Sequence, residues 1–150
     1  MSGDPPAFLD TNVLVYAFDR GDEAKRTASR RLIERLGAEG RLRLSTQVLQ
    51  EFFVNVTRKI STPIGVEDAI HILDDLAVWN PVLIDTDDIR RAARLSAEAM
   101  LSFWDALIVV AAAHSGASTL YTEDMSHGQE ILGVTVVNPF LPDAVHDAAD

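Results

Sequence analysis

One stretch decides the fold of this chain: Pro6-Ala7-Phe8-Leu9-Asp10-Thr11-Asn12-Val13-Leu14-Val15-Tyr16. The apolar run from Ala7 to Leu9 is too short for a helix, and Pro6 suits the start of a strand. We therefore predict a buried strand that ends at Asp10. Thr11 and Asn12 are residue types that cap helices, which predicts a turn into a helix through Phe18. A carboxylate at such a junction lies at the sheet edge where open α/β folds hold their ligands.

The composition limits the class of protein. With 150 residues and 47% hydrophobic content, the chain is long enough for one domain, residues 1–150, with a sizeable core. No apolar stretch reaches transmembrane length, and the first residues lack the pattern of a signal peptide. We therefore expect a cytoplasmic protein that makes no membrane contact. The absence of cysteine excludes disulfides, thiolate nucleophiles and cysteine-based zinc sites.

The charge is acidic and unevenly distributed. The formal net charge is −10, and residues 95–150 hold eight acids and no Lys or Arg. Such a surface repels nucleic acid unless metal ions or local arginines offset it. A merely soluble acidic protein has the same composition. Charge alone therefore decides nothing about partners.

Strands and helices alternate along the rest of the chain. Period-two and apolar runs predict further strands at 41–45, 82–85, 118–121 and 133–137. Amphipathic or apolar segments predict helices at 22–39, 46–59, 65–78, 86–100 and 102–115, with Ser45 or Thr46, Thr86 and Ser102 at their starts. Residues from 139 onward read as an acidic tail with little to hold it in order. This alternation predicts an α/β fold in three layers, a mostly parallel five-stranded sheet flanked by helices.

Four acids from distant segments converge on one edge of this sheet. A helix that directly follows a strand begins at the carboxyl edge, which places Asp10 there and Glu51 about one turn along its helix. The helix from Ser102 runs into the fourth strand, so Asp105 in its first turn points to the same edge. Asp124 follows that strand where it leaves the sheet.

Carboxylates this close repel each other, and one or two divalent cations are the usual remedy. Oxygen ligands, with neither cysteine nor a His-x-x-x-His pair, suit Mg²⁺ or Mn²⁺ and disfavour zinc. Two such ions roughly 3.5–4 Å apart can activate a water and stabilise the leaving oxygen in phosphodiester cleavage.

Each acid also has a plain structural explanation. Asp10 could cap the first helix, and Glu51 could be an exposed helix residue without a role. Ser102-x-x-Asp105 matches a capping box, and Glu123-Asp124 could be an ordinary acidic turn. These would be four independent accidents, whereas a convergent site explains all four placements together.

The sequence resembles the PIN-domain nucleases, and most closely the VapC-type toxins of bacterial toxin–antitoxin pairs. The order and approximate spacing of four matching stretches run across nearly the whole chain. They are Phe8-Leu9-Asp10-Thr11-Asn12-Val13-Leu14, Gln50-Glu51-Phe52, Phe103-Trp104-Asp105-Ala106-Leu107-Ile108 and Tyr121-Thr122-Glu123-Asp124-Met125.

The resemblance implies an endoribonuclease that depends on Mg²⁺ or Mn²⁺ and uses a metal-activated water to cut RNA. It also implies a cognate antitoxin and a homodimer. A basic antitoxin segment could occupy the acidic groove in place of metal and RNA. The implied residues are Asp10, Glu51, Asp105 and Asp124 around one or two metal ions, with Thr11, Asn12 and Thr122 orienting them.

Three residue assignments remain open. Glu123 could replace Asp124 as the fourth acid, although the Thr-x-Asp spacing favours Asp124. A core or helix-start role fits Trp104 better than stacking on an RNA base, which is the alternative. The pair Arg58-Lys59 is the best candidate for a phosphate contact outside the metal site.

Two other classes of function remain. A phosphoryl-transfer domain of receiver or haloacid-dehalogenase type also places an aspartate after the first strand. Against it, no aspartate stands two residues beyond Asp10, and no lysine follows Lys59 to bind a phosphoryl group. A PIN-like binding module that has lost its chemistry is the other alternative.

Overall fold

The structure of the protein is a computed structural model, and the residues that it describes are 3–142. Its first element is a fully buried strand, β1 (Ala7–Leu9), as the opening stretch predicts. Helices and strands then follow in the order α1 (Thr11–Tyr16), α2 (Glu23–Ala38), β2 (Leu42–Arg43), α3 (Thr46–Arg58), α4 (Val66–Ala77), α5 (Thr86–Ala99), α6 (Phe103–His114), β3 (Thr119–Tyr121), β4 (Glu130–Ile131) and β5 (Val134–Val137).

The strands form one sheet in the order β2-β1-β3-β5-β4. All neighbouring strands are parallel except β4 and β5, which pair antiparallel. The prediction of an α/β fold with a mostly parallel five-stranded sheet is confirmed. Leu9 of β1 lies in register with Tyr121 of β3. The residues that follow these two strands, Asp10 and Thr122, therefore lie side by side.

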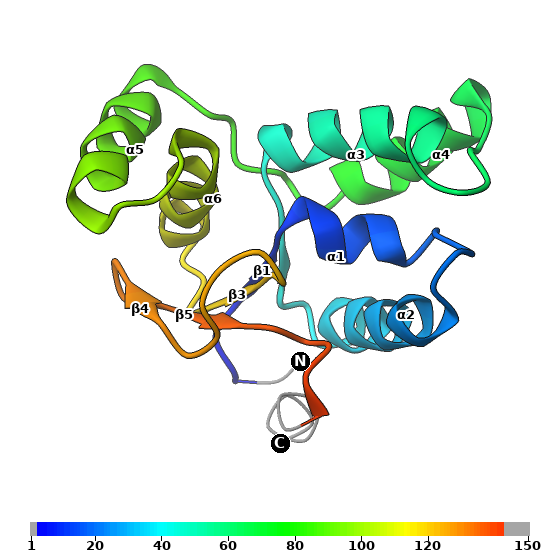
Figure 1. Ribbon diagram of the computed structural model, residues 1–150, viewed down its shortest axis with the longest axis horizontal. Helices are drawn as coiled ribbons and strands as arrows, with labels where there is room; N and C mark the ends of the chain where they lie inside the picture. Colours follow the sequence, from blue (N-terminus) through cyan, green and yellow to red (C-terminus); the bar gives the residue numbers. More distant parts are fainter. Residues whose placement is uncertain (1–2, 143–150) are drawn as a thin grey trace.

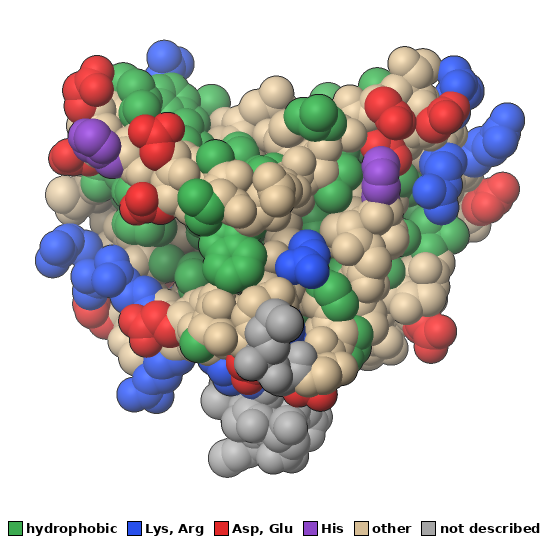
Figure 2. All heavy atoms as spheres, turned by 180° about the vertical axis from the view of Figure 1, so that it is seen from behind, with side chains coloured by type: hydrophobic (Ala, Val, Ile, Leu, Met, Phe, Trp, Pro, Cys, Tyr) green, Lys and Arg blue, Asp and Glu red, His purple; other side chains and the backbone are tan. Residues whose placement is uncertain are grey.

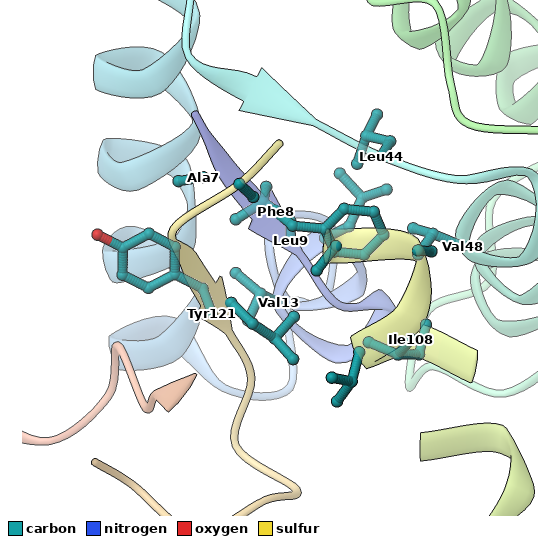
Figure 3. Close-up of a cluster of buried hydrophobic side chains, with 14 of the residues drawn as sticks. Ala7, Phe8, Leu9, Val13, Leu44, Val48, Ile108 and Tyr121 are labelled. Atoms are coloured by element: carbon teal, nitrogen blue, oxygen red, sulfur yellow. The ribbon is translucent and has the colours of Figure 1, made fainter. Parts of the chain in front are cut away.

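The helices form two groups (Figure 1). Helices α5 and α6 lie on one side of the molecule, and α1 to α4 lie on the other. Helix α6 is buried from Ala106 through Ala112, because its sequence is apolar on every face and it packs against β3 and β5. Figure 3 shows side chains from β1, α1, α3 and α6 gathered in this core, among them Leu9, Val13, Val48 and Ile108.

One predicted strand is wrong. Residues 82–85 make only an isolated parallel bridge, between Ser45 and Val82, and Leu83 is 74% exposed. The chain leaves the sheet at once, because Asp85 already caps α5. The fifth strand is instead β4, whose two residues are too few to show a period-two pattern.

The helix caps also differ from the prediction. Asp10 caps α1 in place of Thr11 or Asn12, and that helix ends at Tyr16 rather than Phe18. Asp85, rather than Thr86, caps α5 with a reciprocal capping box. In each instance the acid one residue earlier takes the cap, because its carboxylate accepts a hydrogen bond from a first-turn backbone N–H.

The predicted tail is partly ordered. The Phe140 ring packs edge-on against Tyr16, with 5.2 Å between ring centroids, and its backbone N–H donates to Asn138. Residues 143–150, the rest of that prediction, lie outside the described part of the chain.

The surface gives two further facts. Within residues 3–142, no single helix is long and apolar enough to cross a membrane. On the face seen in Figure 2, acidic and basic side chains are interspersed rather than separated. Local clusters of charge therefore matter more on this face than a uniform field.

The core beneath β1 should dominate stability. Leu9 has no exposed surface, so Leu9→Ala leaves a cavity and should lower the free energy of unfolding by about 2–5 kcal/mol in urea titrations. The control Leu83→Ala removes the same atoms from an exposed position and should change it by less than about 0.5 kcal/mol. Equal losses in the two variants would contradict this assignment of the core.

Candidate functional site

Asp10 is the most enclosed acid of the proposed site. Its side chain is 5% exposed, at the point where β1 ends and α1 begins. One carboxylate oxygen accepts the Thr11 backbone N–H at 2.7 Å, and the other accepts the Thr122 hydroxyl at 2.8 Å. These bonds cap the helix and fix the carboxylate, and capping does not exclude a ligand role for Asp10.

Two polar side chains connect Asp10 to Asp124. The Asn12 amide nitrogen lies 2.9 Å from Asp124 Oδ2 and 3.4 Å from Asp10 Oδ2. The fully buried Thr122 hydroxyl donates to Asp10 and accepts the Asp124 backbone N–H at 3.1 Å. The loop after β3 is thereby held to the start of α1, and both carboxylates are oriented by neutral groups.

Glu51 approaches from α3. Its carboxylate accepts the Gln47 amide at 2.7 Å and the Thr11 hydroxyl at 3.5 Å. Gln47 is 5% exposed, and its Oε1 has no hydrogen-bond partner among the described residues. Our sequence reasoning missed Gln47, although its position four residues before Glu51 puts both on one helix face.

Asp105 lies in the first turn of α6. The Ser102 hydroxyl accepts the Asp105 backbone N–H at 3.0 Å, so the predicted cap exists. Partial burial raises the pKa of the Asp105 carboxyl, and the Asp124 charge raises it further, while Ser102 opposes the shift. The Asp105 and Asp124 carboxylates are therefore close enough to repel each other.

Glu123 and Asp124 face different surroundings. The Glu123 carboxylate accepts hydrogen bonds from the Lys25 ammonium and the Tyr16 hydroxyl, both at 2.7 Å. It does not line the pocket described below, whereas Asp124 does. The Glu123 side chain thus ties the loop after β3 to α1 and α2, and Asp124 is the acid that faces the other three.

A pocket of about 370 Å³ joins these residues. It lies between α6 on one side and α1 and α3 on the other (Figure 1). Its lining comprises the acids Asp10, Asp19, Glu51, Asp105 and Asp124, the polar residues Thr11, Asn12, Tyr16, Gln47, Asn55 and Lys59, and the apolar residues Val15, Ile60, Trp104 and Ile108. All four acids that the sequence singles out therefore reach one pocket.

The charge of these acids is not neutralised by the protein. Burial, together with the charges of Asp124 and Glu51, raises the pKa of Asp10 to about 7 against the opposing hydrogen bonds from Thr122 and Thr11. No ion pair among residues 3–142 involves Asp10, Glu51, Asp105 or Asp124. Bringing unpaired carboxylates together lowers the stability of the folded state, so folding alone does not explain this cluster.

Comparison with known proteins places this arrangement in a family. The model of the PIN domain matches residues 7–127, well over half of the chain. The chain belongs to the PIN-domain family. No curated protein shows a significant match to its sequence.

Solved structures with the same fold are toxin–antitoxin proteins. A toxin–antitoxin complex from Klebsiella pneumoniae is similar at 24% identity and a TM-score of 0.63, over 89% of this chain and 97% of that one. DNA-bound VapBC from Salmonella typhimurium matches at 17% identity and a TM-score of 0.61, over 89% and 97%. VapC20 from Mycobacterium tuberculosis is described as a toxin that cleaves the sarcin–ricin loop. It matches at 20% identity and a TM-score of 0.57, over 79% of this chain and 89% of that one.

The PIN-domain pocket has the donor chemistry of a hard-cation site. Its acidic and amide oxygens are the ligands that Mg²⁺ and Mn²⁺ prefer, and Asp10 is a buried carboxylate without a cation beside it. Within residues 3–142, no three acidic or histidine side chains stand close enough to form a ready-made metal centre. The acids thus surround the pocket as an open cluster, and their chemistry fits a divalent cation.

The raised pKa of Asp10 predicts how stability varies with pH in the metal-free protein. Native Asp10 keeps its proton up to about pH 7, whereas the unfolded carboxyl loses it near its ordinary pKa of 3.8. Protonation of native Asp10 therefore contributes fully to the free energy of unfolding below about pH 4, and this contribution is lost as the pH rises through about 7.

We expect wild-type protein in EDTA to lose up to about 4 kcal/mol relative to Asp10→Asn between about pH 4 and pH 8. The variant carries a neutral side chain of the same shape and lacks this titration. Urea unfolding of both proteins across that range measures the difference. If the free energies of unfolding of the two proteins change with pH in the same way, the pKa of Asp10 is not raised in the native state and the prediction is wrong.

Proposed function

We propose that this PIN-domain protein is a metal-dependent endoribonuclease, the toxin of a toxin–antitoxin pair. The observation that supports it best is the group of acids Asp10, Glu51, Asp105 and Asp124, which line one pocket and form no ion pair with any described residue. Nucleases of the PIN family typically use divalent metal. Burying a carboxylate such as Asp10 without a counter-charge is costly, and a divalent cation removes that cost.

The acids divide into two roles. Asp10 and Asp105 are short and held by helix caps, which suits direct ligation of one or two Mg²⁺ or Mn²⁺ ions. Asp124 and Glu51 complete the coordination directly or through water. When bound, such ions supply an activated water and stabilise the leaving oxygen in hydrolysis of an RNA phosphodiester.

Neutral hydrogen-bond donors orient these ligands. Thr122 and Asn12 donate to the acids that they hold, Asp10 and Asp124, and Thr11 donates to Glu51. Because none of the three is charged, they fix the carboxylates without competing with a cation for their charge. Such partners of metal ligands usually contribute about 10–100-fold to metal affinity or activity.

The partners follow from the structural neighbours. The matched structures include a toxin–antitoxin complex and a DNA-bound VapBC, which favours a cognate antitoxin for this chain. A basic segment of that antitoxin would meet a pocket lined by five acids and one lysine. The protein would act on RNA in the cytoplasm as a homodimer.

A PIN-like binding module without catalysis is the alternative from another class. It needs none of the four acids, yet all four line the pocket. The phosphoryl-transfer alternative loses its support, because the chain matches the PIN family along residues 7–127.

The cleavage assay separates these functions. With total cellular RNA and Mg²⁺ or Mn²⁺, wild-type protein should cut RNA, and Asp10→Asn should cut at least about a hundredfold more slowly, since a direct ligand is worth at least as much as its supporting partners. The initial rate of fragment release on a denaturing gel measures the effect.

Glu123→Gln is the matched control. It removes a neighbouring acid that does not itself line the pocket and whose carboxylate binds Lys25 and Tyr16, so the variant should keep activity within about tenfold of wild type. Metal-dependent cleavage by Asp10→Asn at the wild-type rate would reject the proposed site.

Metal binding should also stabilise the fold. A cation that binds only the native state at a hundred times its Kd adds about 2.7 kcal/mol, so Mg²⁺ or Mn²⁺ should raise the Tm of wild-type protein. Thermal melts at neutral pH should show a much smaller rise for Asp10→Asn. A Tm of wild-type protein that stays constant at millimolar metal would count against a cation in this pocket.

A further inference from the structure

Two residues that line the pocket are not explained by metal binding. Trp104 is 64% exposed, so of the core or helix-start role that the sequence favoured, only the position at the start of α6 is found. Lys59 also lines the pocket, and it is the only Lys or Arg among the lining residues that the structure describes. An exposed indole can stack on a flat aromatic group, and a lone ammonium group can pair with an anion. A ligand with both an aromatic part and a negative part would therefore use both residues.

The Trp104 indole is held in place. It belongs to the first turn of α6, which Ser102 caps, and the Gln47 amide lies 3.5 Å from the Trp104 carbonyl oxygen. The Phe103 ring meets the indole edge-on, with centroids 5.1 Å apart and an interplanar angle of 81°. The helix holds the Trp104 backbone, and the Phe103 ring restricts the indole on one side, which lowers the entropy lost when a flat ligand stacks on it.

The residues Gln47, Glu51, Asn55 and Lys59 form a row on α3. They follow each other at four-residue spacing, so they lie along one face of the helix, and all four line the pocket. The row begins beside the Trp104 carbonyl and ends at Lys59, the cap residue of α3, about 18 Å further along the helix axis. Glu51 lies between these ends, and the Thr11 hydroxyl that donates to its carboxylate belongs to the residue that follows Asp10.

A nucleic-acid strand matches this arrangement. Successive stacked nucleotides are about 3.4 Å apart, so contacts at the two ends of the row fall on different nucleotides. Every base has a flat face that stacks on an indole, and every linkage has a phosphate for an ammonium group. A base inside a duplex is already stacked on both faces, so the base that meets Trp104 must be unpaired.

We propose that Trp104 and Lys59 form two RNA subsites on either side of the carboxylate cluster. An unpaired base stacks on the Trp104 indole, and a backbone phosphate of another nucleotide pairs with the Lys59 ammonium. The cluster then lies against the linkage between them. This inference rests on the proposed ribonuclease function and assigns residues that bind substrate rather than metal.

Binding of two RNA probes tests the subsites. The Asp10→Asn protein, which should not cut RNA, is titrated in Mg²⁺ with a fluorescein-labelled 12-mer of riboadenosine and with an abasic 12-mer of the same charge. We expect tighter binding of the riboadenosine 12-mer, by on the order of tenfold. Adding Trp104→Ala should remove this preference, and Trp104→Phe should keep most of it.

Lys59 should affect both probes alike. Adding Lys59→Met should weaken the binding of the two oligomers by the same factor. It should also reduce the magnitude of the slope of log K against log salt concentration by about 0.7–0.9. Lys59→Arg should retain the slope. The sequence paired Arg58 with Lys59 as a candidate phosphate contact, but the structure brings only Lys59 to the pocket. The controls Arg58→Met and Trp79→Phe change residues that do not line the pocket and should leave both measurements unchanged.

The possible outcomes are distinct. Base preference that survives Trp104→Ala, a salt slope that Lys59→Met does not change, or failure of the Asp10→Asn protein to bind either oligomer would overturn the inference. If the Trp104→Ala and Lys59→Met variants, each with Asp10 intact, cut RNA as fast as wild-type protein, the inference would also be overturned, while the proposed function would stand. Conversely, if the variants show the expected binding differences but wild-type protein does not cut RNA, the proposed ribonuclease function would be rejected and the two RNA subsites would stand.

Discussion

The structure depends on a carboxylate that is buried where its charge has no counter-ion among residues 3–142. Asp10 caps α1 at the end of β1, and its burial beside Asp124 and Glu51 raises its pKa to about 7. The cap accounts for an acid at this position, but a serine or an asparagine would cap the helix without the electrostatic cost. The proposed cation in the pocket would compensate the charge of this acid.

The fold brings the other acids to Asp10 by simple topology. Because β1 and β3 are adjacent and parallel, the segments that follow them lie side by side, and Asn12 and Thr122 then connect Asp10 to Asp124. Helix α3 contributes Glu51 on the face that carries Gln47 and Lys59, so one helix supplies both an acid of the cluster and the proposed phosphate contact. The cluster, its supporting bonds and the substrate contacts thus share the same few elements.

Much of this arrangement could be predicted from the sequence, because helix–strand junctions have strong local signals. The apolar run before Asp10 and the cap at Ser102 were enough to direct two acids to one edge of the sheet. The strand at 82–85 was wrong because an apolar run does not reveal that Leu83 faces solvent. The surroundings of Glu123 and Trp104 could not be predicted, because each depends on contacts with a distant segment. The contact between Gln47 and Glu51 is local to α3, so its four-residue spacing could have revealed it.

The titration of the Asp10 carboxyl tests the central claim most directly. Carbon-13 NMR of the aspartate side chains, assigned by comparison with Asp10→Asn, reports its pKa with and without Mg²⁺. Our account predicts a pKa near 7 in the metal-free protein and a large decrease when Mg²⁺ is added, because a bound cation favours the ionised carboxylate. A pKa close to 4 that does not respond to Mg²⁺ would contradict it.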